Sequence, residues 1–254
     1  MPNFLPDTNR QGLIVWGGEN STDYGIVVGK SPAFDKPKRK MTVFNVPGRN
    51  GSVLFPQNAF EDVVRSYDIW LAEETTEDSG GEISGTLEER VDALTAWLNS
   101  KSGYQELSDN FEPEVYRLAY YSGGNNVSNE MLQFGESTLT FTCRPERFLK
   151  SGKTAVTVTN GSTLTNPTKF ASKPLIHIEG SGIVTITLGG ATIGATVTDY
   201  INIDCERMNA YREPNENMND KIVGTFPSLL SGNNTISIDG TTTLVQITPN
   251  YFTI

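Results

Sequence analysis

The sequence is poor in the side chains on which most catalytic and metal sites depend. Its 254 residues include a single histidine, His177, and two cysteines, Cys143 and Cys205, far apart along the chain. A zinc site of the usual kind needs a close set of Cys, His or acidic ligands, so we expect no metal. The two cysteines are either bridged or, as we expect, two buried free thiols, since free cysteine behaves as a small apolar residue. Phosphate-binding glycine loops, nucleophile elbows and dinucleotide fingerprints are also missing. We therefore expect no enzyme, no cofactor and no catalytic residues.

Long apolar runs and an excess of basic charge are missing as well. No stretch reaches the roughly 18 apolar residues of a membrane-spanning helix. The first ten residues lack a basic start followed by an apolar stretch, so no secretory signal is expected. The formal net charge is −10, which argues against a nucleic-acid-binding surface. We expect no membrane partner and no specific binding of nucleic acid.

The two parts of the chain differ in composition. Residues 1–150 carry 14 basic and 22 acidic side chains, and residues 151–254 carry only 6 and 8. The second part holds 18 threonines, and glycine turns separate its short apolar stretches at even spacing, which is typical of a β-sandwich. We predict two domains, 1–150 and 151–254, linked near residues 150–153.

One helix is predicted, in the first domain. Thr86-Leu87-Glu88-Glu89 is a capping box, in which the Thr hydroxyl and a Glu carboxylate accept hydrogen bonds from free amides. Apolar residues then recur on one helical face, at Leu87, Val91, Leu94, Trp97 and Leu98. Strands are expected at 13–16, 24–28, 63–71, 115–121 and 137–144, the last closed by Pro145. The predicted fold class is mainly β with one helix.

A long β-hairpin is predicted for about residues 40–57. Asn50-Gly51 favours a type I′ turn, and Pro47-Gly48 adds a second break. The hairpin carries apolar residues with no helix beside it in sequence, and an exposed strand edge of this kind usually pairs with a partner. We predict that the hairpin binds a neighbouring subunit. The residues expected at this interface are Met41, Val43, Val46, Arg49, Val53 and Phe55.

Two groups of charged residues each have two interpretations. The basic cluster at residues 36–40 is either a solvated strand entrance that discourages aggregation or the intersubunit partner of the acidic loop at residues 73–85. Asp204 and Glu206 would share one face of a strand by the period-two rule. They are either a contact for carbohydrate or calcium or part of an exposed polar face.

The order of these features along the whole chain resembles a known family. The residues that carry the resemblance are Val46–Ser52, Tyr67–Ile69, Phe141–Pro145, Ile203–Glu206 and Phe226–Asn234. With the acidic loop, the single helix and the Thr-rich second half, they look like the distal tail protein of siphophages that infect Gram-positive bacteria. The resemblance implies an N-terminal β-sandwich-like ring domain with a helix and an extended hairpin, and a galectin-like C-terminal β-sandwich.

The resemblance also implies a structural role in the virion. Members of this family form a hexameric ring, the baseplate hub, which connects the tail tube protein to the tail-associated baseplate protein. In some phages the ring also holds receptor-binding arm proteins for host attachment. It is assembled in the host cytoplasm, and DNA passes through it without specific binding. The alternative is a carbohydrate-binding β-sandwich module that adheres to the host surface, although the second half has no tryptophan on which a sugar could stack.

Overall fold

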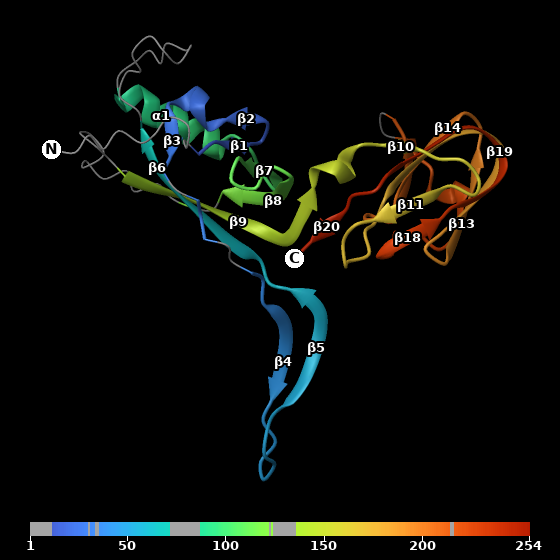
Figure 1. Cartoon of the computed structure of the whole chain (residues 1–254), viewed down its shortest axis with the longest axis horizontal. Helices are drawn as coiled ribbons and strands as arrows, with labels where there is room; N and C mark the ends of the chain where they lie inside the picture. The colour runs from blue at the N-terminus through green and yellow to red at the C-terminus, as the bar shows by residue number, and fades with distance from the viewer. Residues whose placement is uncertain are drawn as a thin grey trace. The chain divides into compact units, whose positions relative to one another are not determined.

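The computed structural model describes residues 12–254 except 30, 34–35, 72–86, 122, 124–135 and 214–215. Within these residues the fold is mainly β with one α-helix, so the predicted fold class is confirmed (Figure 1). The chain divides into two compact units, one up to Arg147 together with Ile254, and one of Phe148–Thr253. The acidic loop at 73–85 and the capping residue Thr86 lie outside the described residues.

A curled antiparallel sheet forms the body of the first unit. Its strand order is β2-β1-β7-β8-β9-β6-β3. The strands are β1 (Ile14–Trp16), β2 (Glu19–Asn20), β3 (Ile26–Val28), β6 (Val63–Leu71), β7 (Gln105–Asp109), β8 (Val115–Tyr121) and β9 (Glu136–Leu149), with a 3-10 helix at Ser21–Tyr24. Gly12, just before β1, exchanges two backbone hydrogen bonds with Val28 of β3, so the sheet curls back towards itself. A Cβ atom on Gly12 would lie only 2.4 Å from the Phe111 ring, and glycine is therefore required there.

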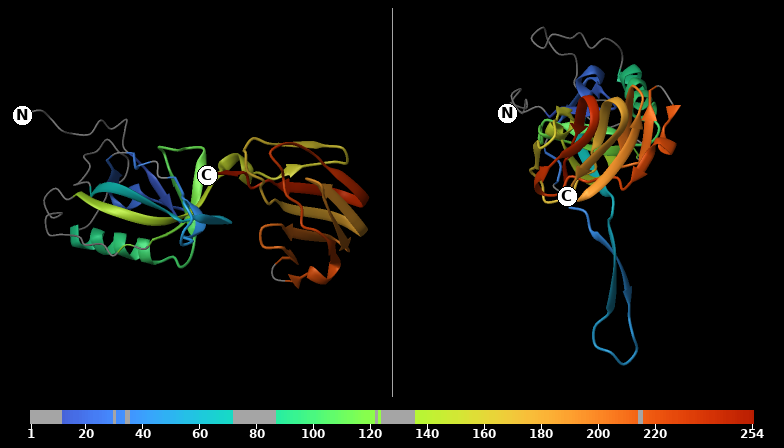
Figure 2. Two further views of the ribbon diagram at one scale, coloured as in Figure 1. Left: turned by 90° about the horizontal axis from the view of Figure 1, so that it is seen from below. Right: turned by 90° about the vertical axis from the view of Figure 1, so that its right-hand side faces the viewer.

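The helix α1 (Leu87–Asn99) lies along the curled sheet (Figure 2). Leu94, Trp97 and Leu98 are buried in the core of the first unit and Val91 is half-buried, as the helical spacing predicted. The Trp97 ring stacks on Tyr24 with their centroids 4.6 Å apart. Its indole Nε1 donates a hydrogen bond of 3.3 Å to the Trp16 carbonyl. Trp97 therefore joins the helix to β1 and to the 3-10 helix.

Trp97→Ala should lower the free energy of unfolding of the first unit by about 3–5 kcal/mol, because truncating a buried tryptophan leaves a cavity. Urea unfolding followed by circular dichroism measures this change. Thr95→Ala, on the exposed side of the same helix, is the control and should change stability by less than about 0.5 kcal/mol. A loss below about 1 kcal/mol for Trp97→Ala would show that this position is not part of the core.

One strand of the first unit was not predicted, and the predicted end of another is wrong. The strand β7 was missed because Gln105–Asp109 contains a single apolar residue, Leu107, although that side chain is buried. Pro145 does not close β9, which continues to Leu149. The strand β6 pairs with β9 only as far as Cys143, so the missing N–H of Pro145 breaks no hydrogen bond to β6.

The second unit is built from a curled sheet and a small two-stranded sheet. The larger sheet has the order β10-β19-β12-β14-β15-β16, with β13 between β12 and β17, and the smaller one pairs β11 with β18. The strands of these sheets are β10 (Val156–Thr157), β11 (Thr163–Asn166), β12 (Leu175–Leu188), β13 (Ala191–Val197), β14 (Tyr200–Asp204), β15 (Asn209–Arg212), β16 (Glu216–Asn217), β17 (Ile222–Gly224), β18 (Gly232–Thr235) and β19 (Ser237–Thr248), with 3-10 helices at Lys150–Lys153 and Asn219–Lys221. The last strand, β20 (Phe252–Thr253), belongs to neither sheet and pairs with β9.

The strand β12 was predicted as two strands, 175–179 and 183–188, with glycines between them. The structure shows one strand, whose pairing with β19 shifts register around Gly180. A Cβ atom on Gly180 would lie 2.3 Å from the Thr241 carbonyl oxygen. The glycine therefore marks a close approach of two strands at a bulge rather than a turn.

Both cysteines are buried and free, as predicted, with Cys143 in the first unit and Cys205 in the second. Burial raises the pKa of the Cys143 thiol to about 11 and that of the Cys205 thiol to about 12. Both thiols pack as small apolar groups in the cores.

Candidate assembly site

The predicted hairpin forms a sheet of its own. The strands β4 (Arg39–Phe44) and β5 (Val53–Phe60) pair only with each other and project from the first unit (Figures 1 and 2). We call residues 36–60 the arm. No arm side chain belongs to the core of the first unit, so packing within the unit does not explain the apolar residues of the arm.

The tip of the arm turns at Pro47-Gly48 and not, as predicted, at Asn50-Gly51. The Arg49 amide donates a hydrogen bond of 3.2 Å to the Val46 carbonyl, and Gly48 has a φ of +78°. Proline followed by glycine at positive φ is the signature of a type II turn. Asn50 does not have the positive φ that a type I′ turn requires. The last pair of the ladder is Phe44–Val53, so an eight-residue loop joins the two strands.

A bulge near the root gives the arm a bend. Arg39 pairs with Phe60 and Met41 with Pro56, so three residues of β5 oppose Lys40 alone. Asn58, in the bulge, has a φ of +52°, which asparagine tolerates better than most residues. Extra residues on one strand of a ladder bend it and increase its twist, so the bulge sets the direction in which the arm leaves the unit.

The apolar side chains of the arm are exposed. All six predicted interface residues lie on it, and among them Met41, Val43, Val46 and Phe55 are each between 44% and 55% exposed. Arg49 is exposed and Val53 is half-buried. The prediction missed Phe44 and Leu54, each 55% exposed, because it assumed that only alternate residues would be apolar. Contiguous exposed apolar side chains mark an interaction surface.

The basic cluster lies at the root of the arm. Lys36, Lys38, Arg39 and Lys40 are exposed, and the Arg39 guanidinium lies 5.0 Å from the centroid of the Phe60 ring. The acidic loop expected as its partner lies outside the described residues, so a salt bridge between the two stays a prediction.

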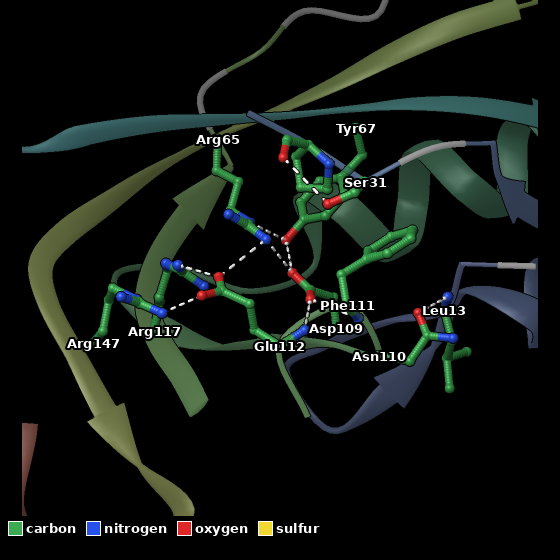
Figure 3. A network of polar contacts seen from close by, with 11 residues as sticks. Leu13, Ser31, Arg65, Tyr67, Asp109, Asn110, Phe111, Glu112, Arg117 and Arg147 are labelled. Atoms are coloured by element: carbon green, nitrogen blue, oxygen red, sulfur yellow. Dashed lines mark hydrogen bonds and ion pairs between the residues drawn. The ribbon is translucent and has the colours of Figure 1, made fainter. Parts of the chain in front are cut away.

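A buried polar network includes Arg65 and Tyr67 of β6, the strand that follows the arm in sequence (Figure 3). The Asp109 carboxylate accepts hydrogen bonds from the Arg65 guanidinium (2.8 Å) and the Tyr67 hydroxyl (2.7 Å). Its other oxygen accepts from the amides of Phe111 and Glu112. Burial raises the pKa of Asp109, but the Arg65 charge and these hydrogen bonds outweigh burial and hold the pKa below its usual value.

Glu112 is the second anion of the network. Its carboxylate contacts three guanidinium groups, those of Arg117 (2.5 Å), Arg65 (3.3 Å) and Arg147. Burial raises the pKa of Glu112, but the hydrogen bond and charge of Arg117 and the charges of the other two arginines lower it further, to below its usual value. The network thus ties β6, the β7–β8 loop, β8 and β9 together and holds the strand that carries the arm.

This network was not predicted, since charged residues are normally expected outside a core. One signal was present in the sequence. In β6, Arg65 lies two residues before Tyr67 and four before Ile69, which both face inward. Side chains two residues apart in a strand share a face, so this spacing places Arg65 inside.

The proposed carboxylate pair of the second unit does not form. The strand β14 ends at Asp204, whose carboxylate accepts hydrogen bonds from the amides of Glu206 (2.9 Å) and Arg207 (3.0 Å). Asp204 therefore closes a turn, and Glu206 lies in that turn instead of sharing a strand face with it. His177 contacts Asn202 (2.7 Å) and Glu179 (3.3 Å).

Among the described residues, no group of three His, Cys, Asp or Glu side chains is placed to bind a metal. None of the described helices has the length and apolar character to span a membrane.

Comparison with known proteins gives matches in structure only. No family model matches the chain, and no curated protein does. A solved structure of the SPP1 Dit protein, described as a paradigm of the hub adsorption apparatus in phages that infect Gram-positive bacteria, matches with a TM-score of 0.71. The match covers 96% of this chain and 99% of the SPP1 protein at 14% identity. The chain has the Dit fold. The resemblance indicated by the sequence is thereby confirmed at the level of the fold, over nearly the full length of both chains.

Proposed function

We propose that the chain is a structural subunit of a phage tail-tip hub, the ring that joins the tail to the adsorption apparatus. The observation that carries this proposal is the match to SPP1 Dit over nearly the whole of both chains. The exposed apolar arm adds independent support, because a monomer has no use for such a surface. Residues 1–150 would form the ring domain and residues 151–254 an outer domain.

The arm would connect neighbouring subunits of a hexamer. It lies at one place on each chain and would bind a different place on the next chain, which is a heterologous contact. Such contacts form a ring when the rotation between neighbouring subunits closes. The interface would include Met41, Val43, Val46, Arg49, Val53 and Phe55, together with Phe44 and Leu54. The bulge and the buried network hold the arm in a fixed direction, which a closed ring requires.

The ring would sit in the virion and act by contact alone. Its partners would be the tail tube protein on one side and the tail-associated baseplate protein on the other, with receptor-binding arm proteins at its rim. We assign it no catalytic activity, no cofactor and no metal. DNA would pass through the ring, and the net charge of −10 on each chain would keep the duplex from binding tightly.

The mass and shape of the purified protein test this function. We expect native mass spectrometry to show a particle of six chains of 27.8 kDa each, and negative-stain images to show a ring with a central channel. A protein that stays monomeric at all concentrations would contradict the proposal.

A further inference from the structure

The arm has two apolar faces that differ in chemistry. Residues paired across an antiparallel ladder share a face. The pairs Phe44–Val53 and Thr42–Phe55 therefore form one face, on which the two Phe rings meet edge to face with centroids 5.6 Å apart. We call it the aromatic face.

The other face is aliphatic. It is formed by the pairs Val43–Leu54 and Met41–Pro56. Each of its four side chains is exposed, and Val43 and Leu54 are more than half exposed. An antiparallel ribbon that lies on a single surface normally has a polar outer face. Neither face of this arm is polar over that length.

We propose that both faces of the arm are buried in the assembly, each against a different copy of this chain, so that one arm joins two neighbours. This inference rests on the proposed ring. An arm that lay on one neighbour only would leave either the aromatic or the aliphatic face in water. A second copy that covers the remaining face removes this cost and makes every arm part of two interfaces.

Charge complementarity identifies the occupant as the same chain. Residues 36–60 contain five basic side chains and no acidic one. The remainder of the chain contains 15 basic and 30 acidic side chains, a formal charge of −15. A strongly basic arm on an acidic body is complementary to the body of another copy, which favours encounter and fixes orientation.

The apolar area of the arm also supports burial of both faces. The exposed apolar side chains Met41, Val43, Phe44, Val46, Leu54 and Phe55 are about half exposed and present roughly 500 Å² together, given that one aromatic side chain buries 150–250 Å². With the partner surfaces counted, their burial removes on the order of 1,000 Å², the lower limit for a specific interface. One face alone would supply about half of that.

Two variants separate the faces. Phe44→Thr with Phe55→Thr removes both Phe rings of the aromatic face. Val43→Thr with Leu54→Thr removes two of the four apolar side chains of the aliphatic face. Threonine is a good strand former, so both variants keep the hairpin. None of these side chains belongs to the core of the first unit, and tryptophan fluorescence, which comes from that unit alone, verifies that each variant is folded.

The control is Ile183→Thr with Val223→Thr. These two residues of the second unit are 72% and 76% exposed, so the control makes the same chemical change at more exposed strand positions. Sedimentation velocity over a series of concentrations measures the concentration at which half of the protein is assembled. We expect each arm variant to raise this concentration at least tenfold and the control to change it less than twofold.

The outcomes are distinct. If one arm variant assembles like the wild type, only one face is used, and the two-sided arm is wrong while the proposed ring stands. If wild-type protein does not assemble at all, the ring and this inference are both wrong.

As a second measurement, a benzoylphenylalanine placed at Phe44 and, separately, at Leu54 should cross-link to another copy from both positions. A cross-link from one position alone would overturn the inference.

Discussion

Shortening the arm should turn the assembly into monomers. In this variant a two-residue Asn-Gly turn replaces residues 43–54, which removes most of the exposed apolar side chains of the arm. Thr42 and Phe55 are paired, and the next pair towards the root of the arm is Met41–Pro56. Proline has no N–H, so Met41–Pro56 is a non-hydrogen-bonded pair, and such pairs alternate with hydrogen-bonded ones. Thr42 and Phe55 can therefore serve as the hydrogen-bonded pair that a two-residue turn needs. We expect the dissociation constant between subunits to rise at least about a thousandfold, or ~4 kcal/mol.

The same change should leave the fold of the first unit intact, because no arm residue belongs to its core. Native mass spectrometry measures the loss of assembly, and tryptophan fluorescence and circular dichroism report the fold. Asn50→Ala, at the tip but without loss of an apolar group, is the control and should assemble normally. A ring that persists after the arm has been shortened would show that subunits associate through another surface.

Glu112→Gln should cost the first unit about 3–5 kcal/mol of its free energy of unfolding, the usual penalty for removing one partner of a buried ion pair. The variant removes the carboxylate that Arg117 and Arg147 contact, and the carboxylate that remains in the network, Asp109, contacts Arg65. Urea unfolding followed by tryptophan fluorescence isolates this unit, because Trp16, Trp70 and Trp97 all lie in it.

Glu146→Gln is the matched control. It makes the same change in the same unit, in an ion pair with Arg144 (3.2 Å) that is partly exposed, and should cost no more than about 1 kcal/mol. An equal loss for the two variants would show that burial of the network contributes nothing.

The network should also make stability depend on pH. The folded-state pKa of Glu112 lies below its usual value, so its contribution is fully present above the unfolded pKa of about 4.3 and is lost as pH falls through the folded pKa. Wild-type stability should therefore fall more steeply below about pH 4.3 than that of Glu112→Gln. Parallel curves for the two proteins would contradict this assignment.

Local patterns in the sequence predicted much of this fold. The β-branched and aromatic run at residues 63–71 forms β6 and the run at 115–121 forms β8, with the predicted bounds. The helical spacing placed Leu94, Trp97 and Leu98 in the core. These elements were predictable because each buries one regular face of its own.

The remaining features depend on contacts between distant residues. The strand β7 is polar in sequence and is held by its neighbours β1 and β8, so its own residues gave little signal. Arg65 is buried because Asp109, 44 residues away, supplies the opposite charge. On the arm, the pattern predicted an apolar hairpin but not its second apolar face, since alternation is expected only where one side of a ribbon meets water.

The buried cysteines have a practical consequence for labelling chemistry. The reactive form of a thiol is the thiolate. With pKa values of about 11 and about 12, Cys143 and Cys205 hold no more than roughly one thiolate in ten thousand at pH 7. A cysteine introduced at the tip of the arm, for example at Asn50, would be the one fast-reacting thiol of the chain. A single dye attached there would follow each arm as it leaves water and meets its neighbours, with both native cysteines left in place.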